Sequence, residues 1–346
     1  NSMSTPFTLS QVEPVLATEL QARLESIEVQ LLDATVSSDP FISEVAGHLA
    51  HAGGKRFRPL LVAMAAQLGT PTPQTEAAAV VVELTHLATL YHDDVMDEAP
   101  RRRGTESANA RWDNTLAILT GDFLFARASQ ILADLGPEAV RLQAQTFERL
   151  VSGQIHETVG PQAGADPVAH HISVLADKTG SLIATSAVFG GMFAGLPAVA
   201  LDSLQQFGEA VGVAFQIADD ILDIASPAEV SGKTPGTDLR EGILTLPMLL
   251  VQAQSRSEDA ELLGLLGREL PDDAEHARAL ELMRAHPAMA LAEAEAQKFA
   301  ERAIDQLSAI RALADVAPMH FATADRVASV LEALEGVCLS TISREV

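Results

Sequence analysis

The sequence predicts an all-α protein built around a single large core. Runs of Val, Ile and Thr with the two-residue alternation of β-strands are scarce, and no Asn-Gly turn joins two apolar stretches. Apolar residues recur instead at helical spacing along most of the chain. Aromatic residues make up only 4% of the sequence and alanines are frequent, which favours helices that pack closely against one another.

The positions of proline and glycine indicate where the expected helices begin and end. Pro71 and Pro73 precede the first long helical pattern, and Gly136-Pro137 separates the next two. We expect loops over residues 160–167 and 226–236, where Gly, Pro and Ser cluster. The expected helices cover residues 75–96, 117–135, 137–152, 169–194, 203–224, 243–253, 257–270, 273–313 with a break near Pro287, and 322–339.

Composition limits the possible functions. The 346 residues include 23 Lys and Arg against 47 Asp and Glu, a formal net charge of −24, and 47% are hydrophobic. This apolar content is too high for intrinsic disorder. So acidic a protein repels nucleic acid, which requires a broad basic surface. We therefore expect no nucleic-acid partner.

The chain is expected to form one domain over residues 4–346. It shows neither a low-complexity linker nor a repeat of 20 to 50 residues. Residues 1–3 are interpreted as a cloning remnant that ends in the start methionine, Met3. The single cysteine, Cys338, cannot form an internal disulfide, which suits a reducing compartment, and we expect a cytoplasmic protein.

One uncharged run, residues 179–201, is long enough to cross a bilayer. Paired glycines at Gly190-Gly191 and the helix-stop pattern Gly195-Leu196-Pro197 interrupt it. We therefore expect a buried core helix here and no membrane span.

Two acidic clusters share the spacing D-D-x-x-D. The first, Asp93-Asp94 with Asp97, ends a long helix and the second, Asp219-Asp220 with Asp223, lies on another. Positions i and i+4 share a face, so the outer carboxylates repel by a few tenths of a kcal/mol, and the helix dipole disfavours them at a C-terminus. A bound cation relieves this cost, and all-oxygen ligands suit Mg²⁺. One such cluster is also explained as a solvated helix end, but two within apolar helices favour Mg²⁺ ions bound to a diphosphate.

Basic residues gather in short motifs despite the acidic composition. Gly53-Gly54-Lys55-Arg56-Phe57-Arg58 and Arg101-Arg102-Arg103 present cations near glycines, where backbone and side chains can approach an anion. His86 lies about two helical turns before Asp93. Each motif alone is also explained as a solvated loop or a structural histidine, but together they favour binding of a second diphosphate.

With these residues assembled, the sequence resembles the trans-isoprenyl diphosphate synthases, the polyprenyl synthetase family. The likeness extends from about Gly53 to Pro247. It implies a large antiparallel helical bundle around a central cavity, the isoprenoid synthase fold, and a homodimer. The motifs that carry it are residues 53–59, 86–104, 121–122, 178–180, 215–223, 232–239 and 245–247.

The resemblance also implies residue roles. Isopentenyl diphosphate would condense with an allylic diphosphate, such as farnesyl or geranylgeranyl diphosphate, on three Mg²⁺ ions. The metal ligands would be Asp93, Asp97, Asp219 and Asp223; the catalytic set would be Asp93, Asp94, Asp97, Asp219, Asp220 and Lys178. Isopentenyl diphosphate would be held by Lys55, Arg58, His86 and Arg103. The allylic diphosphate would be held by Arg102, Lys178, Thr179, Gln216 and Lys233.

Small residues before Asp93 predict long products. In the family, an aromatic residue four or five positions before this aspartate stops elongation, and this chain has Thr89 and Ala88 there. Thr85 is expected to line the same tunnel, in which the growing chain of the product would lie. We therefore expect a medium- or long-chain all-trans polyprenyl diphosphate synthase of the kind that supplies quinone side chains.

Three alternatives remain at this point. One departure from the family pattern is Ile243, where a phosphate-binding lysine is common. It supports a non-catalytic subunit of a heteromeric synthase, although such a subunit would lack one acidic cluster. A terpene cyclase would not need the cations at Lys55 and Arg58. A shorter-chain synthase is the third alternative, because another helix could supply the bulky side chain that stops elongation.

Overall fold

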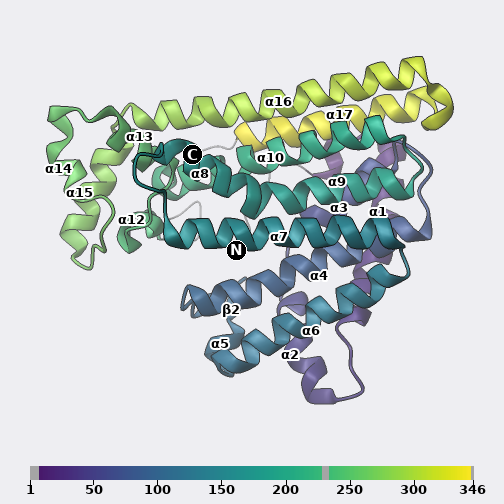
Figure 1. The fold of residues 1–346 in the computed structure, drawn as a ribbon, viewed down its shortest axis with the longest axis horizontal. Coiled ribbons are helices and arrows are strands. Elements are labelled where there is room, and N and C mark those ends of the chain that lie inside the picture. Colours follow the sequence, from purple (N-terminus) through teal and green to yellow (C-terminus); the bar gives the residue numbers. More distant parts are fainter. Residues whose placement is uncertain (1–7, 228–233, 344–346) are drawn as a thin grey trace. The chain divides into compact units, whose positions relative to one another are not determined.

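Helices dominate the computed structural model, which describes residues 8–227 and 234–343 (Figure 1). The described strands are β1 (Arg101–Arg102) and β2 (Thr105–Glu106), which pair antiparallel with Arg101 opposite Glu106. The predicted all-α class is confirmed.

The described chain folds into two compact units, each assembled from separate stretches of sequence. The first unit contains Asn1–Phe147, Leu182–Gly208 and Gln306–Gly336. The second contains Glu148–Ser181, Glu209–Asp305 and Val337–Val346. The expectation of one domain stays a prediction.

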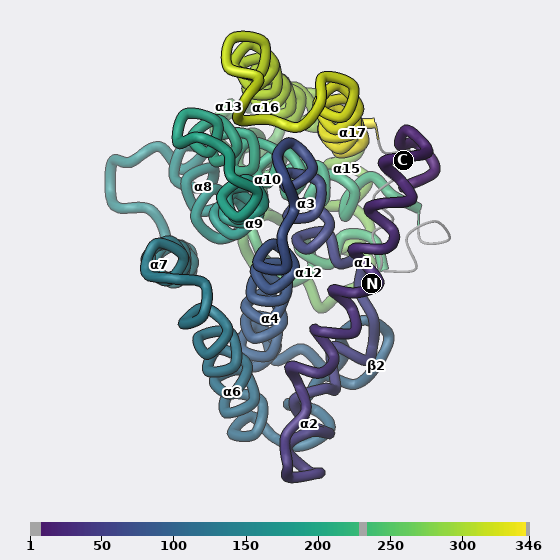
Figure 2. Tube along the Cα trace, turned by 90° about the vertical axis from the view of Figure 1, so that its right-hand side faces the viewer, coloured from purple at the N-terminus to yellow at the C-terminus, as the bar shows by residue number. Residues whose placement is uncertain are grey.

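Helix α4 (Pro73–Met96) is central to the first unit. It packs against α6 (Asn114–Ala133), α3 (Phe57–Ala66) and α1 (Pro14–Ala34), as Figure 2 shows. Helices come close enough that a Cβ on Gly190 would overlap the carbonyl oxygen of Val62. Other elements here are η1 (Leu9–Gln11), α2 (Pro40–His51), α5 (Ala108–Arg111), the start of α7 (Pro137–Val159), α9 (Ser181–Phe193), the start of α10 (Ala198–Ala225), η4 (Pro318–His320) and much of α17 (Ala324–Ile342).

The second unit has an apolar core to which the later part of α10 contributes. Val213, Ile217 and Ile224 are buried there together with Leu246, Val251 and Met283. Burial of such side chains contributes about 1.5–3 kcal/mol each. Its elements include α8 (Pro167–Leu175), η2 (Ala176–Gly180), α12 (Thr237–Glu241), α13 (Leu246–Gln254), η3 (Ser257–Asp259), α14 (Ala260–Leu263), α15 (Asp273–Arg284) and most of α16 (Ala288–Val316).

Most expected helices are confirmed, including the break near Pro287 and the loop that begins at Gly160. One expectation is wrong: residues 257–270 hold only a 3₁₀ turn and the single turn α14. Gly264 follows α14 directly, and Gly267 adopts a left-handed backbone (φ 77°), so the helix cannot continue. Most of the expected loop 226–236 lies outside the described residues.

Three helices near the N-terminus were missing from the expectation. Two of them, α1 and α2, have local signals, because Glu13 accepts hydrogen bonds from two backbone N–H groups at the start of α1. Asp39 does the same for α2, and a proline follows each cap. This cap-and-proline pattern marks helix starts in sequence.

Two described helical stretches are long and apolar enough to cross a membrane. They are Asn114–Ala133, of which 33% of the apolar window is buried, and Pro167–Phe193, of which 67% is buried. Core helices of globular proteins meet the same criteria, so this is weak evidence for a span. Residues 181–190 are all buried, as a core helix requires.

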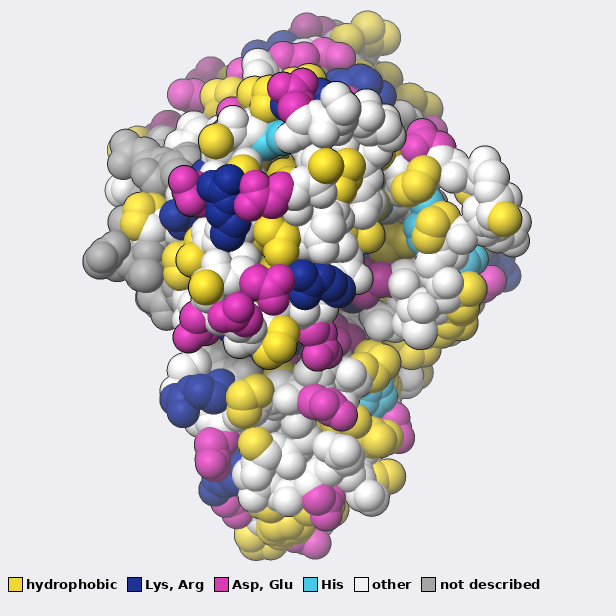
Figure 3. Space-filling view, turned by 90° about the vertical axis from the view of Figure 1, so that its left-hand side faces the viewer, with side chains coloured by type: hydrophobic (Ala, Val, Ile, Leu, Met, Phe, Trp, Pro, Cys, Tyr) yellow, Lys and Arg dark blue, Asp and Glu magenta, His cyan; other side chains and the backbone are white. Residues whose placement is uncertain are grey.

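The surface mixes charges of both signs. On the face shown in Figure 3, basic side chains lie beside acidic ones, and apolar side chains are scattered. Pairs such as Arg278–Glu261 (2.7 Å) and Arg268–Glu275 (2.6 Å) join α14 and α15 to their surroundings. Exposed pairs of this kind contribute little to stability.

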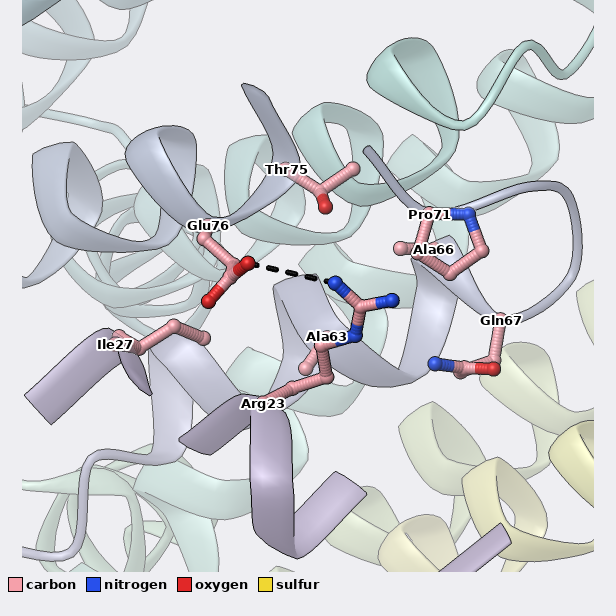
Figure 4. A pocket seen from close by; sticks show the side chains of 8 residues that line it. All are labelled: Arg23, Ile27, Ala63, Ala66, Gln67, Pro71, Thr75 and Glu76. Atoms are coloured by element: carbon pink, nitrogen blue, oxygen red, sulfur yellow. Dashed lines mark hydrogen bonds and ion pairs between the residues drawn. The ribbon is translucent and has the colours of Figure 1, made fainter. Parts of the chain in front are cut away.

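A small cavity of about 10 Å³ lies between α1, α3 and α4 (Figure 4). It has room for about one water molecule. An ion pair between Arg23 and Glu76 (3.4 Å) crosses it. None of the predicted site residues lines it, and Glu76 precedes Asp93 by 17 residues. The lining residues are Arg23, Ile27, Ala63, Ala66, Gln67, Pro71, Thr75 and Glu76.

Candidate functional site

The first acidic cluster ends α4 as predicted. Asp97 caps the helix, and its backbone N–H donates to the carbonyl oxygen of Asp93 at 2.8 Å. Asp93 is half-buried and Asp97 is exposed, whereas Asp94 is only 1% exposed. Asp93 and Asp97 are therefore more accessible to a cation than the residue between them.

Asp94 faces into the protein and meets Arg102. Nε and Nη2 of Arg102 donate to the same oxygen, Oδ1, at 3.0 and 2.6 Å. The carbonyl oxygen of Asp94 accepts from the backbone of Ala99 (2.9 Å) and from the side chain of Asn109 (3.3 Å). These bonds fix the β1–β2 hairpin to the end of α4.

A group of arginines surrounds His86 in the first unit. Arg56 starts α3 from a left-handed backbone (φ 53°) and binds Glu28 with two nitrogens, at 2.9 and 3.1 Å. Arg103 donates to the carbonyl oxygen of Gly53. Lys55, from the same motif, is exposed.

The electrostatics of this group favour the binding of an anion. Burial holds the pKa of His86 well below its usual value, and the charges of Arg58, Arg103 and Arg102 lower it further. The ring is therefore neutral at pH 7. Burial likewise lowers the pKa of Arg58, whose Nε has no acceptor among the described residues. Four of the predicted diphosphate ligands thus lie close together: Arg58, His86, Arg102 and Arg103.

The buried counter-charge for these cations is Glu83. Its side chain is 1% exposed, and Arg56 donates to it at 3.3 Å. Burial raises the pKa of Glu83, while the charges of Arg56, Arg58 and Arg103 oppose the shift. Glu28 pairs with Arg56 and Asp94 with Arg102, so these two carboxylates and Glu83 leave an excess of one positive charge among the four arginines.

The second acidic cluster lies on α10 in the second unit. Asp219 and Asp223 are half-buried, and Asp220 is 8% exposed. Gln216, one turn earlier, donates to Oδ1 of Asp220 at 3.0 Å. Burial raises the pKa of Asp220 well above its usual value, and repulsion from Asp238 adds to the effect. This repulsion is the cost that a bound cation removes.

Asp223 also anchors the segment that follows. Its Oδ2 accepts from the backbone N–H of Asp238 at 3.2 Å, and its carbonyl oxygen accepts from Gly236 at 2.7 Å. The predicted ligand Lys233 lies outside the described residues. Ile243, at the position of the family lysine, is 47% exposed and bonds through its backbone to the carbonyl oxygen of Asp238.

Lys178 and Thr179 lie in a π-helical turn, Ala176–Gly180, between α8 and α9. Such turns recur at functional sites because they shift side chains relative to a regular helix. Arg149 binds Asp177 at 2.9 Å and also pairs with Glu209, which fixes the turn. Nζ of Lys178 pairs with Glu157 at 3.0 Å. This half-exposed pair is weak enough for an incoming phosphate to replace.

The donors suit a magnesium ion that is completed by substrate. Among residues 8–227 and 234–343, no three His, Cys, Asp or Glu side chains are grouped closely enough to hold a metal by themselves. Mg²⁺ commonly uses only one or two carboxylates and takes phosphate oxygens and waters for the rest. Asp93 and Asp97 in the first unit offer oxygen ligands of that kind, and so, separately, does Asp219 in the second unit.

The predicted chain-length residues lie on the face of α4 that precedes Asp93. Ala88 and Thr85 are fully buried and Thr89 is half-buried. Tyr91 points elsewhere, because its hydroxyl donates to the carbonyl oxygen of Val45 on α2 at 2.7 Å. Thr85 accepts a hydrogen bond from Gln143 on α7 at 2.8 Å.

Several residues of the site escaped the sequence argument. Glu83 is a lone acid without a repeated spacing, although it stands out as a charge inside an apolar helix. Gln143 acts through a partner that is distant in sequence, and so does Glu28, which pairs with Arg56 of the basic motif. His171 lies 4.0 Å from Asp220, and burial lowers its pKa to about 4. Only the fold identifies these neighbours.

The fold and the two aspartate clusters define a class of protein. A model of the polyprenyl synthetase family matches residues 39–283. The chain belongs to this family and is a prenyltransferase of it, as the motifs predicted.

Relatives with named activities agree with this assignment. The chain is 48% identical over 302 residues to a nonaprenyl diphosphate synthase of Mycobacterium tuberculosis, covering 86% of this chain and 89% of the relative. A geranylgeranyl pyrophosphate synthase from Corynebacterium glutamicum, solved with calcium and isoprenyl diphosphate, is 41% identical, with a TM-score of 0.82 and coverage of 96% and 98%. A polyprenyl synthase from Caulobacter crescentus is 30% identical, with a TM-score of 0.83 and coverage of 98% and 99%.

Proposed function

We propose that this chain is a Mg²⁺-dependent synthase that condenses isopentenyl diphosphate head-to-tail with an allylic primer, farnesyl or geranylgeranyl diphosphate, into a medium- or long-chain all-trans polyprenyl diphosphate. The observation that carries the product length is the pair Ala88 and Thr89 on α4. The relatives include both a nonaprenyl and a geranylgeranyl diphosphate synthase, so the product length has to follow from this chain's own residues.

The residues divide into two binding groups. Asp93, Asp97, Asp219 and Asp223 hold three Mg²⁺ ions, through which the allylic diphosphate binds. Arg102, Lys178, Thr179, Gln216 and Lys233 bind the same diphosphate directly. Lys55, Arg58, His86 and Arg103 bind isopentenyl diphosphate. The positive charge around neutral His86 supports this last assignment.

Charge stabilisation is the basis of the reaction. Bound Mg²⁺ neutralises the charge that develops on the leaving diphosphate. Lys178 and Arg102 add hydrogen bonds to the same oxygens as the allylic C–O bond breaks and its electron pair leaves with the diphosphate. The double bond of isopentenyl diphosphate then forms the new C–C bond, and the proton lost next passes to the departing diphosphate. No protein nucleophile is required.

We further propose a cytoplasmic homodimer. Exposed apolar side chains follow one another along α7 at helical spacing, and Ile118 and Leu119 are exposed on α6. Apolar surface of this kind marks association sites. The α7 residues are Val140, Phe147, Val151, Ile155 and Val159. A monomeric mass in sedimentation equilibrium at micromolar concentration would contradict the dimer.

Incubation with labelled isopentenyl diphosphate, farnesyl diphosphate and Mg²⁺ tests the proposal, with EDTA as the control. Products of about C30 or longer that vanish with EDTA support it. Products that stop near C20 keep prenyl transfer and favour the shorter-chain alternative. No incorporation with farnesyl diphosphate, or with geranylgeranyl diphosphate in a parallel incubation, would favour a non-catalytic subunit, the alternative that Ile243 supports.

A further inference from the structure

The two D-D-x-x-D clusters share a feature that their sequence does not show. In each, the second aspartate is the most buried of the three acids, with Asp94 1% and Asp220 8% exposed. The first and third acids are half-buried or exposed. The two clusters lie on different helices and in different units, so the agreement does not come from shared packing.

Each buried aspartate holds one polar side chain that is proposed to bind the allylic diphosphate. Asp94 Oδ1 accepts both hydrogen bonds from Arg102, at 3.0 and 2.6 Å. Asp220 Oδ1 accepts one from Gln216, at 3.0 Å. Two charge-assisted hydrogen bonds from one guanidinium to one carboxylate oxygen hold Arg102 in position.

The remaining carboxylate oxygen of Asp94 is poorly placed to ligate a metal. Asp94 Oδ2 is buried and has no hydrogen-bond partner among the described residues. Asp94 could reach a cation at the helix end only by turning outward, which would break the contacts with Arg102.

We propose that the second aspartate of each cluster is a positioning residue and not a metal ligand: Asp94 aims Arg102, and Asp220 aims Gln216, at the allylic diphosphate. The inference rests on the proposed function. Metal binding then belongs to the first and third aspartates alone. Two acids that look equivalent in sequence thus have different tasks.

Asp93→Asn, Asp94→Asn and Arg102→Gln separate the two roles. The first readout is the Mg²⁺ concentration that gives half-maximal activity. The second is the affinity for farnesyl thiodiphosphate, measured by calorimetry at saturating Mg²⁺. We expect D93N to raise the Mg²⁺ requirement at least tenfold. We expect D94N and R102Q to leave it within threefold while weakening the thiodiphosphate about tenfold.

The double variant D94N/R102Q checks the coupling. Residues that act as one unit are not additive, so its affinity should equal that of R102Q within twofold. A Mg²⁺ requirement in D94N that rises as it does in D93N overturns the proposal. Independent, multiplied losses in the double variant overturn it as well. If D94N does not fold, R102Q decides: unchanged thiodiphosphate affinity in R102Q refutes the role of Asp94.

The second cluster provides an independent repetition. Asp220→Asn and Gln216→Leu should weaken the thiodiphosphate to a similar extent without changing the Mg²⁺ requirement, whereas Asp219→Asn should raise it. An Asp220→Asn enzyme with the metal dependence of Asp219→Asn would overturn the proposal for this cluster. A wild-type protein without prenyl transfer would instead refute the proposed function.

Discussion

Gln143 on α7 donates a hydrogen bond of 2.8 Å to the hydroxyl of Thr85 on α4, eight residues before Asp93. The hydroxyl in turn donates to the carbonyl oxygen of Val81 at 2.8 Å. Oε1 of Gln143 is buried without a partner among the described residues. A polar contact therefore joins two helices beside the residues proposed to line the tunnel.

This contact predicts unequal effects of two substitutions on stability. Thr85→Val leaves the buried amide of Gln143 without an acceptor, and we expect a loss of about 1–3 kcal/mol. Gln143→Leu removes the unsatisfied oxygen with the donor, and we expect a change within about 1 kcal/mol. Urea denaturation of both variants measures the difference. Equal losses would show that the amide is satisfied in solution.

Gly54 is expected to control the position of Arg103. A Cβ on Gly54 would lie 2.7 Å from Cζ of Arg103, whereas a Cβ on Gly53 meets no atom within 4 Å. Both glycines have positive φ, 145° and 92°, so alanine strains the backbone at either position by about 1–3 kcal/mol. Gly54→Ala should raise KM for isopentenyl diphosphate about tenfold, and Gly53→Ala should not. Similar KM values in both variants would contradict the role given to Arg103.

Restoring the family lysine at residue 243 should strengthen allylic binding. The side chain of Ile243 is 47% exposed, so Ile243→Lys should change stability by less than about 0.5 kcal/mol. A new charge-assisted hydrogen bond to phosphate predicts a KM for farnesyl diphosphate lower by about three- to tenfold. Ile243→Gln is the neutral control. A KM that both variants leave unchanged would mean that residue 243 does not face the substrate.

The buried His171 is expected to cause part of the loss of stability of the substrate-free protein in acid. Burial lowers its pKa to about 4, while the unfolded chain binds the proton near pH 6.5. Because the unfolded state is protonated first, stability falls as pH drops from about 6.5 toward 4. Between pH 7 and 5 the wild type should lose about 2 kcal/mol more than His171→Asn. Parallel losses in urea titrations at the two pH values would refute this.

Local patterns made the fold class and most helices predictable. Helical periodicity and the breaks at Gly136-Pro137 and Pro287 have physical causes that act within one turn of chain. Residues 257–270 were misjudged because their apolar spacing suits a helix, while α14 ends at Leu263 and Gly267 adopts a left-handed backbone that a longer helix could not include. Periodicity reports the burial pattern but not the backbone conformation.

The parts of the site that form a repeated sequence motif could be predicted. The parts that depend on contacts between residues distant in sequence could not. The spacing of Asp93 and Asp97 was enough to predict a shared helix face. Nothing in the adjacent pair Asp93-Asp94 shows that the second acid turns inward to Arg102, because that depends on the hairpin that follows. Glu83 also became a neighbour of the site only through folding.

The size of the product tests the central claim most directly: that no side chain on α4 blocks elongation beyond Asp93. Wild type, Ala88→Phe and Tyr91→Phe would be incubated with farnesyl diphosphate and excess isopentenyl diphosphate, and the products sized by chromatography. We predict products of about C30 or longer from wild type and Tyr91→Phe, whose ring faces α2, and C20 or shorter from Ala88→Phe. Wild-type products that end at C20, or an Ala88→Phe enzyme that still makes C30 or longer, would contradict it.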